Sequence, residues 1–442
     1  MRPILPVHRA APRLVLAPLA LLALICLALP GQAEAQGQRT ITFQDLMKFR
    51  AIQSPAISED GTIVAYALQP DRGDGEGVVH VLATGRVHRV PRGGAPIITR
   101  DGRHVAMPVK ISFADIEKPA KDRPKPGLAI VETSTGKVTT IENADRLAFS
   151  QDGRWAAYFV APPEPQKDEK EKAGEAPRPA TLHLRDLSTG ADTELGRATA
   201  FAFDQASNLL AYAAATVDGA GNGLYVLDSG PGAAPLAVVQ AAKGRYESIA
   251  WSSEGSRLAF LAGVEAKPGE AGAATLWTWD GKARRARALA AAAQAPKGWT
   301  LPLENEVAWS RDGRRVFFGF RPDGPPPGDR NEEKAAEPDP YDVDRLLEKV
   351  ELDVWHWKDP QIQTQQRIGW GRQKDRTYRA VAHLESGRVV ALADLEVPDV
   401  RIPDNARVAL GTTTVPYARQ ATWDEGGRDA WLVDLETGKR TQ

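Results

Sequence analysis

The residue types that carry out acid–base and nucleophilic chemistry are scattered along this sequence rather than grouped into a motif. No serine after residue 35 has glycine at both −2 and +2, so the Gly-x-Ser-x-Gly turn that exposes a catalytic serine in many hydrolases is missing. The phosphate-binding motif Gly-x-x-x-x-Gly-Lys-Ser/Thr and the zinc-binding motif His-Glu-x-x-His are missing too. We therefore predict no catalytic residue, no cofactor site and no metal site in this chain.

Histidine and cysteine support the same prediction. The histidines beyond residue 35 show no spacing of paired ligands on one helix, and they are His80, His88, His104, His183, His356 and His383. The only cysteine is Cys26, which excludes a disulfide framework and a cysteine-based metal site. A scattered histidine is usually a structural residue.

One segment, Asp-Val-Trp-His-Trp-Lys-Asp-Pro at 353–360, concentrates Trp355, His356 and Trp357. A strand with both tryptophans on one face would explain it. Alternatively, Trp355, His356 and Trp357 form a surface that docks a partner domain or lines a substrate cavity.

The elements that would position any site come from an internal repeat. Its pattern is apolar, Ser, any residue, Asp, Gly, two variable residues, then apolar-Ala-aromatic. Copies lie near 57–66, 98–107, 149–158, 203–212, 251–260, 309–318 and 384–392, the fourth degenerate and the last weaker. Asp-Gly between apolar runs predicts a β-hairpin, so Asp60, Asp101, Asp152 and Asp312 are interpreted as turn residues rather than general acids or bases.

A second signal lies between the copies: an apolar run followed by a turn such as Thr135-Gly136-Lys137 or Thr437-Gly438-Lys439. Each repeat thus supplies about four strands, and propeller blades recur every 40 to 50 residues or so. We predict an all-β fold, a β-propeller of about seven or eight four-stranded blades, and whether the chain holds a complete propeller stays open. A β-sandwich array or a β-solenoid is the alternative.

Composition separates insertions from blades. The segments 162–180 and 321–340 are rich in Pro, Glu, Lys and Asp, so we expect them to be mobile insertions that cannot bury apolar surface. The Ala-rich stretch 288–295 could form a short helix or a linker.

The N-terminus has the pattern of a secretory signal peptide. Three arginines precede an apolar run at 14–29, and Ala33-Glu34-Ala35 fits a cleavage site before Gln36. The run is short for a membrane anchor, which is the alternative. We therefore expect a signal peptide at 1–35, a propeller at 36–442, a periplasmic or secreted location and no membrane span after signal removal. Lys+Arg (56) and Asp+Glu (57) nearly balance, which argues against nucleic acid as a partner.

The serial Ser-x-Asp-Gly hairpins resemble the propellers of exported TolB-like proteins and of the prolyl oligopeptidase family of serine peptidases, family S9. Two segments are similar to the N-terminal start of S9 propellers: Ile-Thr-Phe-Gln-Asp-Leu-Met at 41–47 and Ser-Pro-Ala-Ile-Ser-Glu-Asp-Gly at 54–61. The segment 350–360, with Gln363, Gln365 and Gln366 after it, is similar to a segment of long exported bacterial S9 peptidase-like proteins.

This resemblance implies a propeller that precedes an α/β-hydrolase domain carrying Ser, Asp and His and that admits only peptides to the active site. No triad residue can be carried over to this chain. Judged by the spacing of its repeats, the sequence ends at Gln442 in the middle of the propeller. The Glu-Glu amine-binding motif of the dipeptidyl-peptidase branch is not recognisable either. Two functions follow: the substrate-gating cap of an exported S9-type peptidase, whose partners are an α/β-hydrolase domain and peptides, or a stand-alone TolB-like propeller that binds another periplasmic protein.

Overall fold

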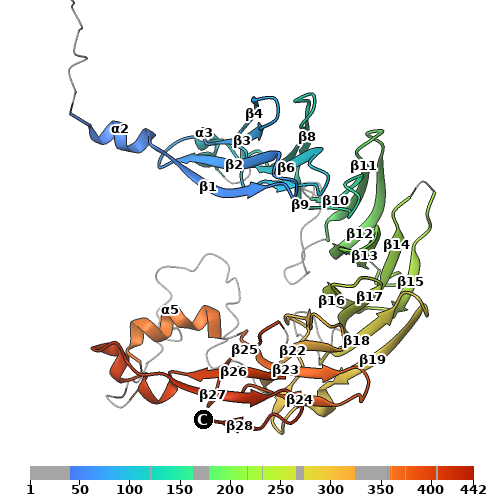
Figure 1. The fold of residues 1–442 in the computed structure, drawn as a ribbon, viewed down its shortest axis with the longest axis vertical. Helices are drawn as coiled ribbons and strands as arrows, with labels where there is room; N and C mark the ends of the chain where they lie inside the picture. The colour runs from blue at the N-terminus through green and yellow to red at the C-terminus, as the bar shows by residue number, and fades with distance from the viewer. Residues whose placement is uncertain are drawn as a thin grey trace, which may run out of the picture. The chain divides into compact units, whose positions relative to one another are not determined.

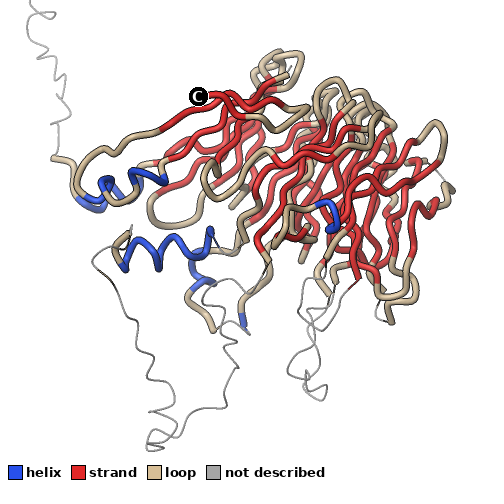
Figure 2. Tube along the Cα trace, turned by 90° about the horizontal axis from the view of Figure 1, so that it is seen from below, coloured by secondary structure: helices blue, strands red, loops and turns tan. Residues whose placement is uncertain are grey.

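The computed structural model describes residues 40–119, 122–162, 179–216, 218–230, 232–264, 273–323, 356, 359, 361–373, 375–404 and 407–442. Within these residues, strands predominate and helices are few and short (Figure 2). The predicted signal peptide and most of the two predicted insertions, 162–180 and 321–340, lie outside the described residues. No helix in the described ranges combines the length and the apolar character that crossing a membrane requires.

The chain forms two compact parts. The smaller part includes 40–49 and 70–72 and contains helix α2 (Phe43–Lys48). Its first turn is closed by a capping box, in which the Thr42 N–H donates to Asp45 Oδ2 (3.0 Å) and the Asp45 N–H donates to Thr42 Oγ1 (3.3 Å). The larger part, 50–69 and 73–442, contains almost all of the strand residues.

The strands form consecutive four-stranded antiparallel blades (Figure 1). Blade 1 is β1 (Arg50–Ile57), β2 (Ile63–Pro70), β3 (Glu76–Val81) and β4 (Arg86–Pro91). Blade 2 is β5 (Ile97–Ile98), β6 (His104–Val109), β7 (Gly127–Glu132) and β8 (Val138–Glu142). Blade 3 is β9 (Ala144–Phe149), β10 (Trp155–Val160), β11 (Thr181–Asp186) and the first half of β12 (Asp192–Phe203).

Blade 4 is the second half of β12 with β13 (Leu209–Ala214), β14 (Gly223–Asp228) and β15 (Leu236–Gln240). Blade 5 is β16 (Gly244–Trp251), β17 (Arg257–Val264), β18 (Thr275–Asp280) and β19 (Arg285–Ala291). Blade 6 has two short segments, β20 (Trp299–Thr300) and β21 (Ala308–Trp309), in the position of its first strand, since both pair with β22 (Arg315–Pro322), and its third and fourth strands are β23 (Tyr378–His383) and β24 (Val389–Ala391). Blade 7 is β25 (Asp399–Arg401), β26 (Val408–Thr413), β27 (Asp429–Asp434) and β28 (Arg440–Thr441).

Strand β12 explains why seven blades in the described chain form only six sheets. Its first half pairs with β11, and its second half pairs with β13, which joins blades 3 and 4 into one seven-stranded sheet. Short helices lie outside the blades: α3 (Phe113–Ile116), η2 (Ala292–Gln294), α5 (Gln363–Gln373), η3 (Val415–Tyr417) and η4 (Gln420–Thr422). The first half of the Ala-rich stretch, 288–291, ends strand β19, and 292–294 form the 3-10 helix η2, so the predicted short helix forms over only part of the stretch.

The hydrophobic core lies between successive blades. Successive side chains of a strand point to opposite faces of its sheet. In β10, Ala156 and Tyr158 pack in a cluster with blade 2, whereas Ala157 and Phe159 pack in a cluster with blade 4. Each of the six junctions between blades has such a cluster of buried residues. The fold is therefore an all-β propeller arrangement of four-stranded blades, as predicted.

The repeat motif places a hairpin at the first turn of six blades. The copies from 57–66 to 309–318 join the first strand of a blade to its second. The copy at 384–392 was interpreted wrongly, because its turn joins β23 to β24, the third and fourth strands of blade 6. There the Gly387 N–H donates to the His383 carbonyl (2.9 Å), as the Gly438 N–H donates to the Asp434 carbonyl (2.8 Å) in a Thr-Gly-Lys turn.

Two tryptophans at one repeat position connect neighbouring blades. The Trp251 indole N–H donates to the Ala202 carbonyl of blade 4 (3.0 Å), and the Trp309 indole N–H donates to the Ala250 carbonyl of blade 5 (2.9 Å). This repeat position therefore packs between neighbouring blades. Each bond joins a blade to the preceding blade.

Candidate functional site

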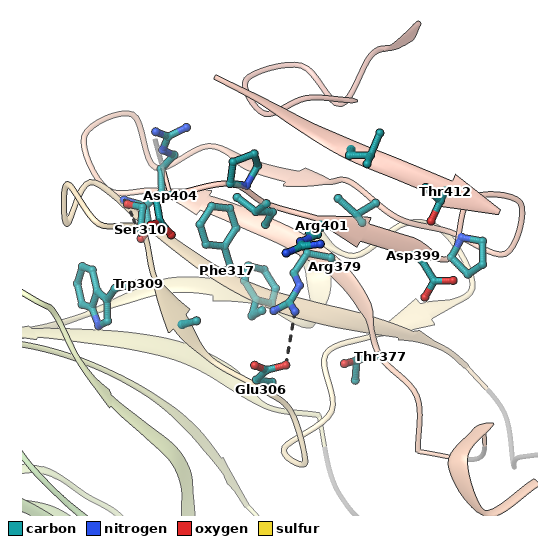
Figure 3. Close-up of a pocket in the computed structure, with 18 of the residues that line it drawn as sticks. Glu306, Trp309, Ser310, Phe317, Thr377, Arg379, Asp399, Arg401, Asp404 and Thr412 are labelled. Carbon is teal, nitrogen blue, oxygen red and sulfur yellow. Dashed lines mark hydrogen bonds and ion pairs between the residues drawn. The ribbon is translucent and has the colours of Figure 1, made fainter. Parts of the chain in front are cut away.

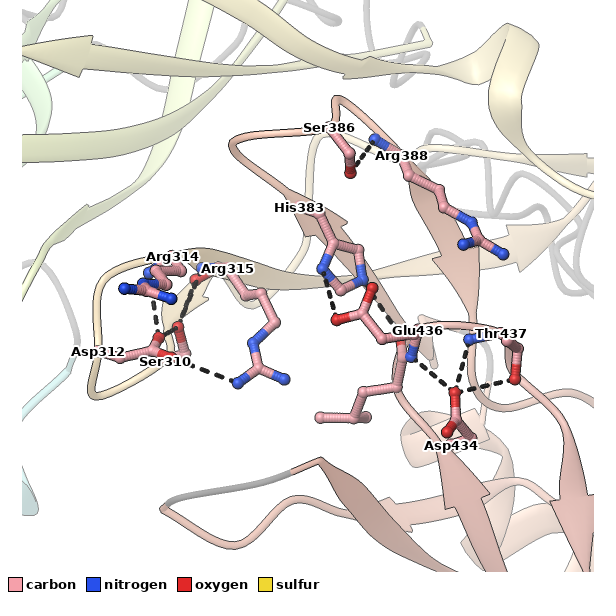
Figure 4. Close-up of polar contacts among 11 residues, drawn as sticks. Ser310, Asp312, Arg314, Arg315, His383, Ser386, Arg388, Asp434, Glu436 and Thr437 are labelled. Carbon is pink, nitrogen blue, oxygen red and sulfur yellow. Dashed lines mark hydrogen bonds and ion pairs between the residues drawn. The ribbon is translucent and has the colours of Figure 1, made fainter.

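The recurring Ser and Asp side chains are occupied by their own turns (Figure 4). The Ser310 hydroxyl donates to Asp312 Oδ1 (2.5 Å) and accepts the Arg315 N–H (3.0 Å). Asp312 also accepts the Arg314 N–H (3.1 Å). The bond from Ser310 is the main cause that lowers the pKa of Asp312. This carboxylate therefore stays ionised and caps a turn.

The same arrangement recurs in three other blades. Ser58 donates to Asp60 (2.5 Å), Thr99 to Asp101 (2.7 Å) and Ser150 to Asp152 (2.6 Å). The following glycine has a positive φ of 61° to 71° in these four turns, as an L-residue rarely does. The turn interpretation of these aspartates is thus confirmed.

Four of the described imidazoles, those of His80, His88, His183 and His383, have structural partners. His383, at 7% exposure, bonds the Leu435 carbonyl through Nε2 (3.1 Å) and lies 3.4 Å from Glu436 Oε1 through Nδ1 (Figure 4). His183 Nδ1 lies 3.0 Å from Asp192 Oδ1, and the His183 ring stacks on the ring of Tyr158. Burial is the main cause that raises the pKa of Tyr158. Burial lowers the pKa of His104, which favours its neutral form. Within the described ranges, no three His, Cys, Asp or Glu side chains gather as metal ligands.

The segment singled out at 353–360 is only partly described. His356 is exposed, its N–H donates to Asp359 Oδ2 (3.0 Å), and its carbonyl accepts the Asp359 N–H (2.9 Å). Trp355 and Trp357 lie outside the described residues. A docking or cavity role for the three residues stays a prediction.

A cavity of about 710 Å³ lies between blades 6 and 7 (Figure 3). Its walls come from the first hairpin of blade 6, from β23, and from β25 and β26 of blade 7. Its volume is in the range of ligand-binding clefts, about 300–1,000 Å³. Apolar groups on its walls include Phe317, Val400 and Leu410.

Arginine dominates the charge of this cavity. Six arginines line it, against three carboxylates: Arg311, Arg315, Arg376, Arg379, Arg401 and Arg428, with Glu306, Asp399 and Asp404. One close ion pair joins Arg376 to Asp399 (2.7 Å), whereas Arg379 reaches Glu306 at 3.5 Å and Arg311 reaches Asp404 at 4.0 Å. The lining therefore carries a net positive charge although the whole chain has a net charge of −1.

Sequence reasoning missed this cavity. Its arginines are spread from 311 to 428 and come from separate hairpins and strands. No local pattern marks such a set, because β-strand pairing and blade packing bring the side chains together.

No family model matches this sequence, and no curated protein matches it significantly. Three solved structures with a similar backbone have 12–14% identity. The β-propeller domain of the Trilobed protease from Pyrococcus furiosus has 12% identity and a TM-score of 0.35, over 89% of this chain and 98% of that one. Porphyromonas gingivalis dipeptidyl peptidase 4 has 14% identity and a TM-score of 0.47, over 88% of this chain and 52% of that one. A eukaryotic initiation factor has 12% identity and a TM-score of 0.45, over 91% of this chain and 77% of that one.

The chain spans about half the length of the dipeptidyl peptidase that it matches. At such identities, and at TM-scores below 0.5, these similarities carry no information about activity.

Proposed function

We propose that this chain is the propeller portion of an exported serine peptidase of the prolyl oligopeptidase type. In this proposal it caps an α/β-hydrolase domain, in the periplasm or outside the cell, and admits peptides while excluding folded proteins. The support is the resemblance of the hairpin motif and of the segments 41–61 and 350–366 to that family. The fold adds consecutive four-stranded blades.

The observation that carries the proposal is that the repeated Ser and Thr hydroxyl groups are hydrogen-bonded within their own turns. Ser58, Thr99, Ser150 and Ser310 each bond the aspartate two residues ahead and cap a backbone N–H five residues ahead. A nucleophilic serine needs a general base and an oxyanion hole instead. The repeats thus supply a scaffold, and the proposed chemistry belongs to a hydrolase domain.

A second candidate is a stand-alone TolB-like propeller that binds another periplasmic protein. The arginine-lined cavity between blades 6 and 7 favours a binding role of this kind. The DNA downstream of codon 442 separates the two functions. A coding region with a Gly-x-Ser-x-Gly motif favours the peptidase, and an unrelated gene favours the stand-alone propeller.

The gating role has its own test. The hydrolase domain, if one is encoded downstream, is assayed with and without this chain on a short chromogenic peptide and on casein. We expect the chain to reduce casein cleavage strongly and to leave cleavage of the short peptide almost unchanged. Equal rates on casein with and without the chain, despite complex formation in gel filtration, would contradict gating.

A further inference from the structure

We propose that the cavity between blades 6 and 7 binds an acidic polypeptide segment, with its arginines holding carboxylates of that segment. This inference rests on the cavity alone and stands whether or not the chain caps a peptidase. It starts from the arginines that form no ion pair within the described residues.

Arg401 and Arg428 have no ion-pair partner among the described residues, and both side chains are exposed. Arg379 comes from β23 and Arg401 ends β25, and Figure 3 shows both side chains directed into the same part of the cavity. Like charges that share a cavity repel each other, and an anion between them removes the repulsion. The planar guanidinium group binds a carboxylate through two parallel hydrogen bonds.

Neutral and apolar groups complete the surface. Thr377 and Thr412 line the cavity, and their hydroxyls have no hydrogen-bond partner within the described ranges. Leu410 is 43% exposed and forms an apolar wall beside the arginines. A peptide that alternates acidic and apolar side chains would place carboxylates on the arginines and its apolar groups on this wall.

The carboxylates of the cavity favour a peptide over a nucleic acid. Asp399 (65% exposed) and Glu306 (76% exposed) lie among the arginines and would repel a continuous phosphate backbone. The same carboxylates can accept backbone N–H groups of a peptide. Phosphate and single-stranded DNA are therefore competitors in the test rather than the expected ligands.

The experiment measures fluorescence polarisation of a fluorescein-labelled, amidated peptide of alternating glutamate and leucine, beside the same peptide with glutamine in place of glutamate. We expect the glutamate peptide to bind at least tenfold more tightly and to lose affinity as sodium chloride rises from 50 to 300 mM. The variants Arg401→Gln and Arg428→Gln should each weaken binding at least fivefold. Lys282→Gln, the same charge change at an exposed turn outside the cavity, should leave binding unchanged.

Circular dichroism confirms that each variant is folded. The proposal is overturned by equal affinity for the glutamate and glutamine peptides, or by no binding at 1 mM peptide. An equal loss in Lys282→Gln, or tighter binding of inorganic phosphate or a single-stranded oligonucleotide than of the glutamate peptide, overturns it as well.

Discussion

The first hairpins of successive blades contact each other through the glycine that follows the Asp or Glu of the turn. In these turns Gly102, Gly153 and Gly255 have φ values of 67°, 70° and 75°. A Cβ built on Gly102 would meet no atom closer than 3.5 Å. A Cβ on Gly153 would lie 2.8 Å from an Asp101 carboxylate oxygen of blade 2, and one on Gly255 would lie 2.5 Å from the Ala206 Cβ of blade 4.

Alanine at these three positions separates backbone strain from contact between blades. The left-handed conformation costs an L-residue about 1–2 kcal/mol, so Gly102→Ala should lose about that much free energy of unfolding. Overpacking adds about 1–3 kcal/mol. Gly255→Ala should therefore lose about 2–5 kcal/mol, because the Ala206 methyl group cannot rotate away. Gly153→Ala should fall between them, because the Asp101 carboxylate can move.

Equilibrium urea unfolding, followed by tryptophan fluorescence and circular dichroism, measures these losses. Gly102→Ala is the matched control, since it changes the same motif position at nearly the same φ. Losses that agree within about 0.5 kcal/mol across the three variants would refute the packing of each hairpin against the preceding one. A greater loss in Gly102→Ala than in Gly255→Ala would refute it too.

Three further predictions concern stability and export. Arg154 donates to Asp186 (2.7 Å), and this bond is the main cause that lowers the pKa of the buried Asp186 carboxylate. The ionised Asp186 therefore stabilises the folded state above about pH 4, and this stabilisation is lost as the pH falls. Asp186→Asn should thus lower the free energy of unfolding by about 2–3 kcal/mol at pH 7 and flatten its decline between pH 5 and pH 2, measured by urea titration at each pH. Trp309→Phe removes the bond to the Ala250 carbonyl and should cost about 1–2 kcal/mol, and an unchanged urea midpoint would contradict the contact. Mass spectrometry of the exported protein should find Gln36 at the N-terminus, and intact Met1 would exclude signal cleavage.

Local sequence signals predicted the hairpins and their order well. Asp-Gly turns between apolar runs are short-range features, and each of the copies from 57–66 to 309–318 forms the expected hairpin. The misplaced copy at 384–392 shows the limit of such signals. Glu385-Ser386-Gly387 shares its serine and its positive-φ glycine with both kinds of turn in this fold, so only strand pairing distinguishes them.

Long-range packing decided the features that the sequence did not predict. The Ala-rich stretch 288–295 has high helix propensity, yet cross-strand pairing of β19 with β18 makes residues 288–291 a strand. The arginine-lined cavity depends on the junction of blades 6 and 7, and no local spacing indicates it. The inter-blade role of Trp251 and Trp309 was predictable because their position recurs in the repeat.

The most direct test of the central claim is whether the purified chain has a reactive serine. The chain is incubated with a fluorophosphonate probe, and intact mass spectrometry measures any adduct. We expect no stoichiometric adduct, because Ser58, Ser150 and Ser310 bond turn aspartates and Ser252 bonds the Gly255 carbonyl (3.2 Å). A stoichiometric adduct that disappears on changing one serine to alanine would show that the chain has its own active site and would contradict the scaffold interpretation.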